Sequence, residues 1–177
     1  MALIDLAPHN MTANNAPAPF VASASSEYSG DFAAWKAFQG GLGTNAYWIG
    51  TGNGVDWLKL YIYSPKTLYS YTLYANTTPE ATRMPKNFTM EGSIDNSNWV
   101  VLDTRTNETA WGSGEGRNYV CQTPSLIAFT YYKLDVTANN GDTYTQVGEL
   151  YLYNRILYNY LHARRNRLDM KGISVPR

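Results

Sequence analysis

The chain has 177 residues, of which 44% are hydrophobic and only 16% are charged, against about 25% charged residues in an average soluble domain. This length accommodates one domain with a self-sufficient core, and the single cysteine, Cys121, excludes an intrachain disulfide. The formal net charge is zero. Because nucleic acid binding depends on a basic surface, we do not expect nucleic acid as a ligand of the folded domain.

The N-terminal residues 1–19 contain three prolines and no periodic apolar pattern. We expect them to form an extended arm without a core face of its own, which lies along the sandwich or along a neighbouring molecule. They include neither a basic segment nor a long apolar run, which favours synthesis in a cytoplasm without a signal peptide and without a transmembrane helix.

Strands are predicted where apolar and polar residues alternate or where aromatic residues gather. In chain order these are 20–27, 58–63, 68–74, 87–92, 99–102, 119–122, 129–136 and 147–153. One or two helical turns are expected at 31–38, and Pro65 is expected to end its strand. Loops are expected at 75–85, 104–117 and 137–145. Many short strands and little helix predict an all-β fold, an antiparallel β-sandwich.

The C-terminal segment 154–177 carries six basic residues and one acidic residue. Its apolar residues fall roughly at helical spacing. Two interpretations stay open: a partly ordered solubilising tail, or an amphipathic helix that docks onto a partner.

Several stretches, taken in order, resemble the discoidin (F5/8 type C, galactose-binding-like) family and related carbohydrate-binding modules. They are 21–27, 34–40, Trp48, 57–60, 83–93, 95–102, and 131–134 with 147–152. The resemblance covers residues 20–153 and implies a jelly-roll sandwich with a ligand site in the loops at one end.

The resemblance also implies a structural Ca²⁺, whose ligands would come from Gln39, Thr44 and Glu149. Relatives that bind calcium usually have Asp at the position of Gln39. The change removes an anionic oxygen from a site that takes about 6 to 8 oxygen ligands. The alternative is a metal-free loop held by hydrogen bonds.

Catalysis is not expected. The only imidazoles, His9 and His162, lie in the two terminal segments, and no nucleophile elbow, metal-binding histidine pair or phosphate loop is present. We therefore predict a protein that is not an enzyme.

Sugar binding needs an aromatic face for the pyranose ring and planar polar groups for its hydroxyls, both of which loops can present. Trp111 is the leading candidate, because Gly and Ser flank it in a loop with little local core to join. Trp48, Trp57 and Trp99 are instead expected in the core. The predicted ligand-binding set is Trp111, Arg117, Tyr28, Tyr47, Arg83, Asn139, Asp142 and Tyr144.

Residues 10–17 look like the openings of discoidin modules in bacteriophage tail and virion proteins. We therefore expect a module of a phage tail, fibre or capsid-associated protein that binds a host-surface glycan and is multimeric in the virion. The alternative is a purely structural virion protein whose sandwich and terminal arms contact other virion proteins. Membrane insertion is not expected, because the loops are rich in Gly, Asn and Thr.

Overall fold

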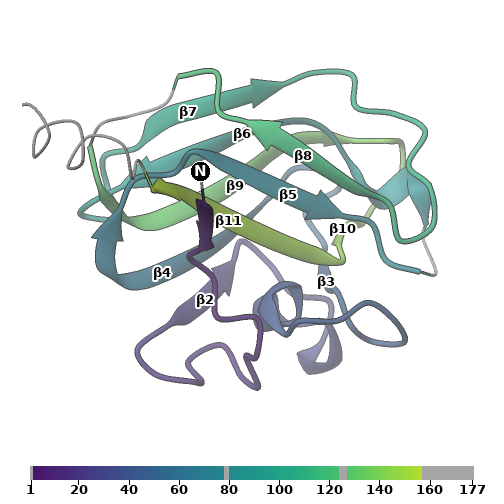
Figure 1. Ribbon diagram of the computed structural model, residues 1–177. Helices are drawn as coiled ribbons and strands as arrows, with labels where there is room; N and C mark the ends of the chain where they lie inside the picture. Colours follow the sequence, from purple (N-terminus) through teal and green to yellow (C-terminus); the bar gives the residue numbers. More distant parts are fainter. Residues whose placement is uncertain (1, 78–79, 124–126, 157–177) are drawn as a thin grey trace, which may run out of the picture.

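The computed structural model describes residues 2–77, 80–123 and 127–156. It is an antiparallel β-sandwich, so the predicted all-β fold class is confirmed (Figure 1). One sheet has the order β1 (Ala2–Asp5), β11 (Glu149–Ile156), β5 (Ser70–Tyr74), β8 (Gly116–Val120). The facing sheet has the order β2 (Val21–Ala24), β4 (Asp56–Lys66), β9 (Phe129–Asn139), β6 (Pro85–Ser93), β7 (Val100–Arg105).

Short elements connect the strands at one end of the sandwich. β3 (Trp48–Gly50) pairs with β10 (Thr145–Val147). The expected helical turns are the 3₁₀ helices η1 (Gly30–Phe32) and η2 (Ala34–Phe38), and a third, η3 (Ala81–Arg83), precedes β6. No helix in the described part of the chain is long and apolar enough to cross a membrane.

The core lies between the two sheets and follows the period of two along each strand. In β4, Leu58, Leu60 and Ile62 are buried while the residues between them face outward. Trp48 is fully buried, as predicted, and each such side chain contributes about 2 kcal/mol or more through removal of apolar surface from water. The Cys121 thiol is also buried, and burial raises its pKa to about 12.

One prediction about two tryptophans and one about Pro65 are wrong. Trp57 and Trp99 are not core residues but half-buried on the outer face of the five-stranded sheet, where Lys59 and Lys133 lie 4.8 and 4.7 Å from the respective ring centroids. β4 also continues through Pro65 to Lys66. The register between β4 and β9 shifts between Tyr61 and Lys66, and such an irregularity accommodates a residue without an N–H donor.

The N-terminal segment, expected as an extended arm without a core face, packs on the sandwich and contributes to its core. β1 pairs with β11, and Leu6 and Met11 belong to the hydrophobic core. At the other end of the chain, β11 extends to Ile156, beyond the expected boundary at residue 153. The remainder of the basic segment, 157–177, lies outside the described residues.

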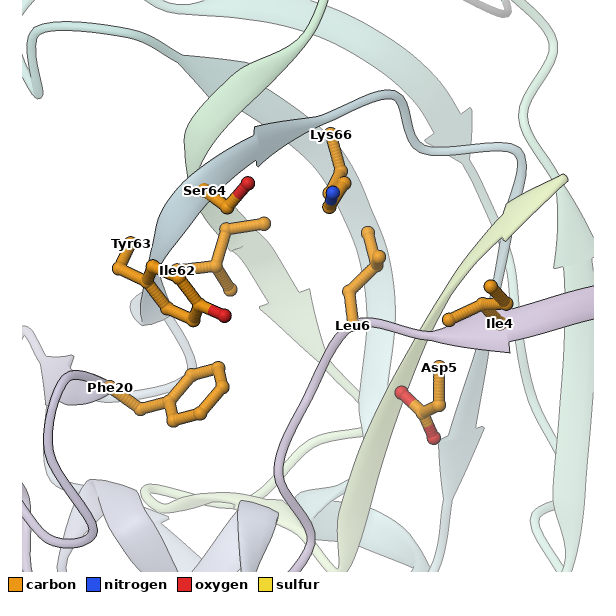
Figure 2. Close-up of a pocket in the computed structure, with 8 residues that line it drawn as sticks. All are labelled: Ile4, Asp5, Leu6, Phe20, Ile62, Tyr63, Ser64 and Lys66. Carbon is orange, nitrogen blue, oxygen red and sulfur yellow. The ribbon is translucent and has the colours of Figure 1, made fainter. Parts of the chain in front are cut away.

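A shallow hollow of about 180 Å³ lies between the end of β1 and the far end of β4 (Figure 2). Its lining is mainly apolar and includes Ile4, Phe20 and Tyr63. Tyr63 is 60% exposed and packs edge-on against Phe20. Along β4, this tyrosine lies away from the end where β4 begins at Asp56.

A buried polar contact joins the two sheets. The Tyr71 hydroxyl on β5 donates to Asp103 Oδ2 on β7 at 2.6 Å, and both residues are almost fully buried. Arg105 Nε donates to the same oxygen at 2.7 Å, and Gln122 N donates to Asp103 Oδ1 at 3.2 Å. Burial, together with the Asp103 carboxylate, raises the pKa of Tyr71 well above its usual value, so the hydroxyl keeps its proton as a donor.

We predict that Tyr71→Phe lowers the free energy of unfolding by about 2 kcal/mol, because the buried Asp103 carboxylate loses a donor. Urea denaturation measures the change. The matched control is Tyr63→Phe, whose exposed hydroxyl predicts a change below about 0.5 kcal/mol. Equal effects of the two variants would contradict the assigned role of the contact.

Candidate functional site

Four of the predicted ligand-binding residues meet in a continuous cluster on the loops. Arg83, in η3, donates from Nε to Asp142 Oδ2 at 3.2 Å, and its guanidinium lies 5.2 Å from the ring centroid of Tyr144. Tyr28, which follows β2, packs edge-on against Tyr144 with centroids 5.4 Å apart. Tyr28 is 54% exposed, so part of its ring faces solvent.

The aromatic surface continues from Tyr28 through a residue that the sequence analysis missed. Phe32, in η1, lies 6.0 Å from Tyr28 and 5.0 Å from Tyr47, measured between ring centroids. Tyr47 is the fifth predicted residue in the cluster. The sequence pattern predicts only a helical turn for Phe32. Its spacing of four residues from Tyr28 is the one feature of the sequence that could have indicated a shared aromatic surface. We call Tyr28, Phe32, Tyr47, Arg83, Asp142 and Tyr144 the loop cluster.

Asn139 shapes the loop cluster from below rather than facing a ligand, which corrects its predicted role. Its Nδ2 donates to the carbonyls of Asp142 and Tyr144, both at 2.7 Å, and its Oδ1 accepts from Gly141 N and Asp142 N at 2.9 and 3.2 Å. Only 9% of Asn139 is exposed. Its hydrogen-bonding groups are thus used within the loop between β9 and β10.

Asp142 holds Arg83 in place as a carboxylate. Partial burial acts to raise the pKa of Asp142, but the hydrogen bond from Tyr144 N at 2.9 Å and the charge of Arg83 outweigh it and lower that pKa. Arg83 donates to Asp142 through Nε, so this contact uses neither of its two terminal nitrogens. A guanidinium that is bonded through Nε can still donate hydrogen bonds from its two terminal nitrogens to neighbouring oxygens of a ligand.

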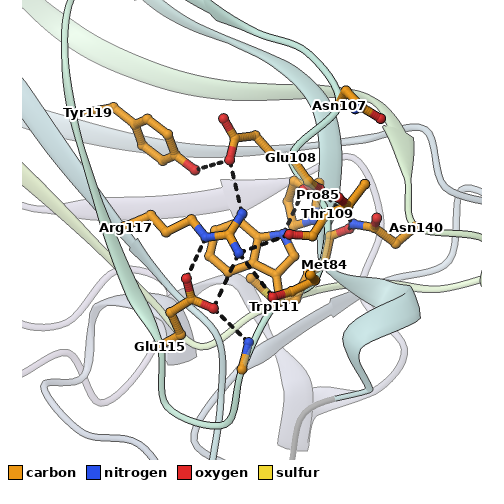
Figure 3. Close-up of polar contacts among 12 residues, drawn as sticks. Met84, Pro85, Asn107, Glu108, Thr109, Trp111, Glu115, Arg117, Tyr119 and Asn140 are labelled. Atoms are coloured by element: carbon orange, nitrogen blue, oxygen red, sulfur yellow. Dashed lines mark hydrogen bonds and ion pairs between the residues drawn. The ribbon is translucent and has the colours of Figure 1, made fainter.

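Trp111 is not an exposed platform, and the prediction that it would be one is wrong. Its side chain is 4% exposed and belongs to the hydrophobic core, and its Nε1 donates to Pro85 O at 3.2 Å (Figure 3). The Arg117 guanidinium covers the ring, 4.0 Å from its centroid. An indole covered on one face and packed into the core has no free face to offer to a sugar.

Arg117 is likewise committed within the protein. Its Nε donates to Glu115 Oε1 at 2.6 Å, Nη1 to Glu108 Oε2 at 3.0 Å, and Nη2 to the carbonyls of Thr109 and Ala110 (Figure 3). The hydrogen bond to Glu115 and the pair with Glu108 raise the pKa of Arg117. The prediction that Arg117 contacts a ligand therefore conflicts with the use of its donors.

A second group of residues, which we call the support layer, packs next to η3. It consists of Trp111, Arg117 and Asn140. Trp111 binds the carbonyl of Pro85, and Asn140 Nδ2 donates to the carbonyls of Met84 and Glu108 at 2.9 and 3.0 Å. Met84 and Pro85 immediately follow Arg83 in the chain. The support layer thus positions the backbone that carries the arginine of the loop cluster.

The residues of the predicted calcium site do not fit a calcium ion. Glu149 Oε1 accepts from Gly40 N and Gly41 N at 2.7 and 2.9 Å, and Oε2 lies 3.2 Å from His9 Nδ1. These neighbours are N–H donors, whereas calcium requires a shell of oxygen ligands. Thr44 is exposed in its loop, and no group of three or more His, Cys, Asp or Glu among the described residues is arranged to hold a metal.

Solved structures with similar folds were found by comparison. Two are family 32 carbohydrate-binding modules from Clostridium perfringens. CpGH89CBM32-5, solved with GalNAc-β-1,3-galactose, has a TM-score of 0.65 and 16% identity over 84% of this chain and 99% of the module. The NanJ module, solved with galactose, has a TM-score of 0.64 and 17% identity over 86% of this chain and 100% of the module.

An F5/8 type C domain from Bacteroides fragilis has a TM-score of 0.63 and 18% identity over 78% of this chain and 93% of that domain. This chain has the carbohydrate-binding-module fold. No protein-family model matches the sequence, and no curated protein matches it. The similar modules from Clostridium perfringens are binding modules rather than catalytic domains.

We predict that Trp111→Phe lowers the free energy of unfolding by about 1 kcal/mol, because the Pro85 carbonyl loses its donor while the core stays filled. Binding of any saccharide should change less than about twofold if Trp111 acts only through the support layer. Thermal unfolding and glycan titration of the same sample measure the two effects. Loss of binding with unchanged stability would instead show that Trp111 contacts the ligand directly.

Proposed function

We propose that this protein is a non-catalytic glycan-binding module whose saccharide site is the loop cluster. The observation that carries the proposal is that an exposed aromatic ring, Tyr28, and an arginine held by a carboxylate, Arg83, both contact Tyr144. Tyr28 is 54% exposed beside Tyr144, and Arg83 is held over Tyr144 by Asp142. Aromatic faces cover the C–H face of a pyranose, while guanidinium and carboxylate groups bond its hydroxyls.

The fold supports the same proposal, since structures with this fold have been solved with galactose and with a galactose-containing disaccharide. The loop cluster also lies on segments that a rigid sandwich presents, from the β2–β3 region, η3 and the β9–β10 loop. A site spread over three segments on a fixed frame is preorganised, so little ordering is needed when a ligand binds.

We predict that Tyr28→Ala and Arg83→Ala each weaken glycan binding about tenfold or more, a change that corresponds to ~1.4 kcal/mol of binding free energy. The measurement is a glycan array with multivalently displayed protein, followed by titration of the best ligand. Display is needed because linked weak sites gain avidity by roughly 10² to 10⁴. Thermal unfolding of each variant checks that the fold is retained.

The matched control is Tyr63→Ala, which removes an aromatic ring of similar exposure, 60% against 54%, from the hollow at the other end of β4 (Figure 2). We expect Tyr63→Ala to bind like the native protein. A blank array for the native protein, or equal losses for Tyr28→Ala and Tyr63→Ala, would contradict the proposed site. A blank array would favour the alternative function in assembly.

We also propose that the module belongs to a bacteriophage particle and binds a host-surface glycan there. The support is the resemblance of residues 10–17 to the openings of virion discoidin modules, and it comes from the sequence alone. Mass spectrometry of purified particles is expected to detect the chain in stoichiometric amounts with the structural proteins. Its absence from purified particles would contradict this part of the proposal.

A further inference from the structure

The outer face of the five-stranded sheet carries aromatic and basic side chains that the loop cluster does not use. Leu58 and Leu60 of β4 are buried, so the residues that alternate with them lie on the outer face. Two rows of directly paired residues cross β2, β4 and β9 on this face. One row is Val21, Tyr61 and Tyr131, and the other is Ser23, Lys59 and Lys133. Aromatic rings and lysines therefore lie side by side on one surface of the sheet.

These rows border a hollow of about 320 Å³. Its lining is Val21, Ser23, Lys59, Tyr61, Asn96 and Tyr131. The rings of Tyr61 and Tyr131 have centroids 4.9 Å apart and planes tilted by 44°, and both residues are only half-buried. Sites for small molecules have volumes of about 300 to 1,000 Å³, with apolar walls and a few polar groups. The hollow has the size and the lining of such a site.

Lys59 is the basic residue of the hollow. Its Nζ donates to Asn96 Oδ1 at 2.8 Å and lies 4.8 Å from the ring centroid of Trp57. Lys59 forms no ion pair within the described part of the chain, and an ammonium group has three donors, so donors remain for a ligand. Partial burial and the charge of Lys133 lower the pKa of Lys59. Both effects disfavour its positive charge, and a bound anion would oppose them.

The charged neighbours of the hollow are already engaged. Lys133 Nζ lies 2.9 Å from Glu91 Oε2 and 3.5 Å from Asp135 Oδ1, so its charge is compensated. Asp95, in the turn between β6 and β7, accepts hydrogen bonds from its own turn with both carboxylate oxygens. The charge of Lys59 is therefore available to an anionic group of a ligand.

We propose that this hollow is a second saccharide site and that it takes sugars carrying an acidic group, a carboxylate or a sulfate. The acidic group pairs with Lys59. The two tyrosine rings cover C–H groups of the sugar, while Ser23 and Asn96 bond its hydroxyls. None of the lining residues is acidic, so the hollow itself does not repel an anion. A hollow bordered by aromatic rings favours a ring-shaped ligand over the flexible side chain of an acidic peptide.

The hollow and the loop cluster share no residue, so either site can bind without the other. Their charges also differ. The guanidinium of Arg83 is already paired with Asp142, whereas the ammonium of Lys59 has no carboxylate partner among the described residues. Acidic sugars are therefore expected to prefer the hollow, and uncharged sugars the loop cluster.

The first test is an array of uronic, sialylated and sulfated oligosaccharides, each beside its uncharged parent sugar, probed with multivalently displayed protein. Lys59→Gln should weaken binding of the acidic members about tenfold or more, because Gln removes the charge and keeps a donor for Asn96. The matched control is Lys36→Gln, which removes another half-buried lysine, whose Nζ lies 4.4 Å from the Trp35 ring centroid. This control should bind like the native protein, and thermal unfolding checks that each variant is folded.

Arg83→Ala on the same array separates the two sites. Binding of acidic sugars that survives Arg83→Ala and is lost in Lys59→Gln supports the hollow. The reverse pattern would assign acidic sugars to the loop cluster and overturn the inference. A native protein that binds none of the acidic members would overturn it too, while the site proposed at the loop cluster would still stand on its uncharged ligands. Poly-glutamate that competes as well as the acidic sugars would show attraction to charge alone, against a saccharide site.

The second test concerns the aromatic wall. Tyr131→Thr keeps a strand-forming residue on β9 and should weaken binding of the acidic sugars about fivefold or more, because one of the two rings is lost. The matched control is Tyr153→Thr, which removes a half-buried tyrosine of β11 that stacks on Tyr151 with centroids 6.1 Å apart. We expect no change in the control. Equal losses in the two variants would contradict a sugar contact at the hollow.

Discussion

The arrangement of one end of this sandwich depends on a single buried charge. Glu149, the first residue of β11, is 1% exposed, and a carboxylate at such a place is tolerated only when its oxygens are fully engaged. Its partners come from two other segments, His9 from the N-terminal segment and the N–H groups of Gly40 and Gly41 from the loop after η2. The need to satisfy Glu149 therefore brings together three parts of the chain that are distant in sequence.

The N-terminal segment also forms hydrogen bonds to the residues that lead into the loop cluster. Within the N-terminal segment, Asn14 accepts a hydrogen bond from Trp35 N at 3.0 Å and donates to Glu27 Oε1 at 2.9 Å. Glu27 Oε1 also accepts from Ala34 N at 2.8 Å, which fixes the start of η2. Tyr28 follows Glu27 directly, and its backbone N–H donates to the Ile49 carbonyl at 2.9 Å, so the backbone that carries the exposed ring is held in place. The N-terminal segment thus contributes to the site without a side chain in it.

The sequence predicted the fold class, and the alternation in β4 located a core strand, because burial on a sheet depends on local periodicity. Five of the eight candidate residues lie together in one cluster, since the segments that connect strands at one end of a sandwich converge. The sequence could not separate two arginines in similar loops. Arg83 is bonded through Nε alone, whereas Arg117 donates from all three of its nitrogens to its own loop. That difference, like the burial of Trp111 and the pairing of His9, depends on how distant segments close over one another.

At the loop end of the sandwich, residues with buried side chains stabilise the loops, whereas the exposed residues of the loop cluster are available to a ligand. Trp111, Arg117 and Asn139 have satisfied their hydrogen-bonding groups within the protein, so they give rigidity, and a ligand would have to break those contacts to reach them. Tyr28 is 54% exposed, and Arg83 uses only Nε in its bond to Asp142, so contact of a ligand with the Tyr28 ring or with the terminal nitrogens of Arg83 does not break that bond. A site built on one exposed ring and one arginine is expected to bury little of the surface of a ligand. Its affinity for one saccharide is therefore expected to be low, and the number of sites presented together determines how tightly a glycan-covered surface is held.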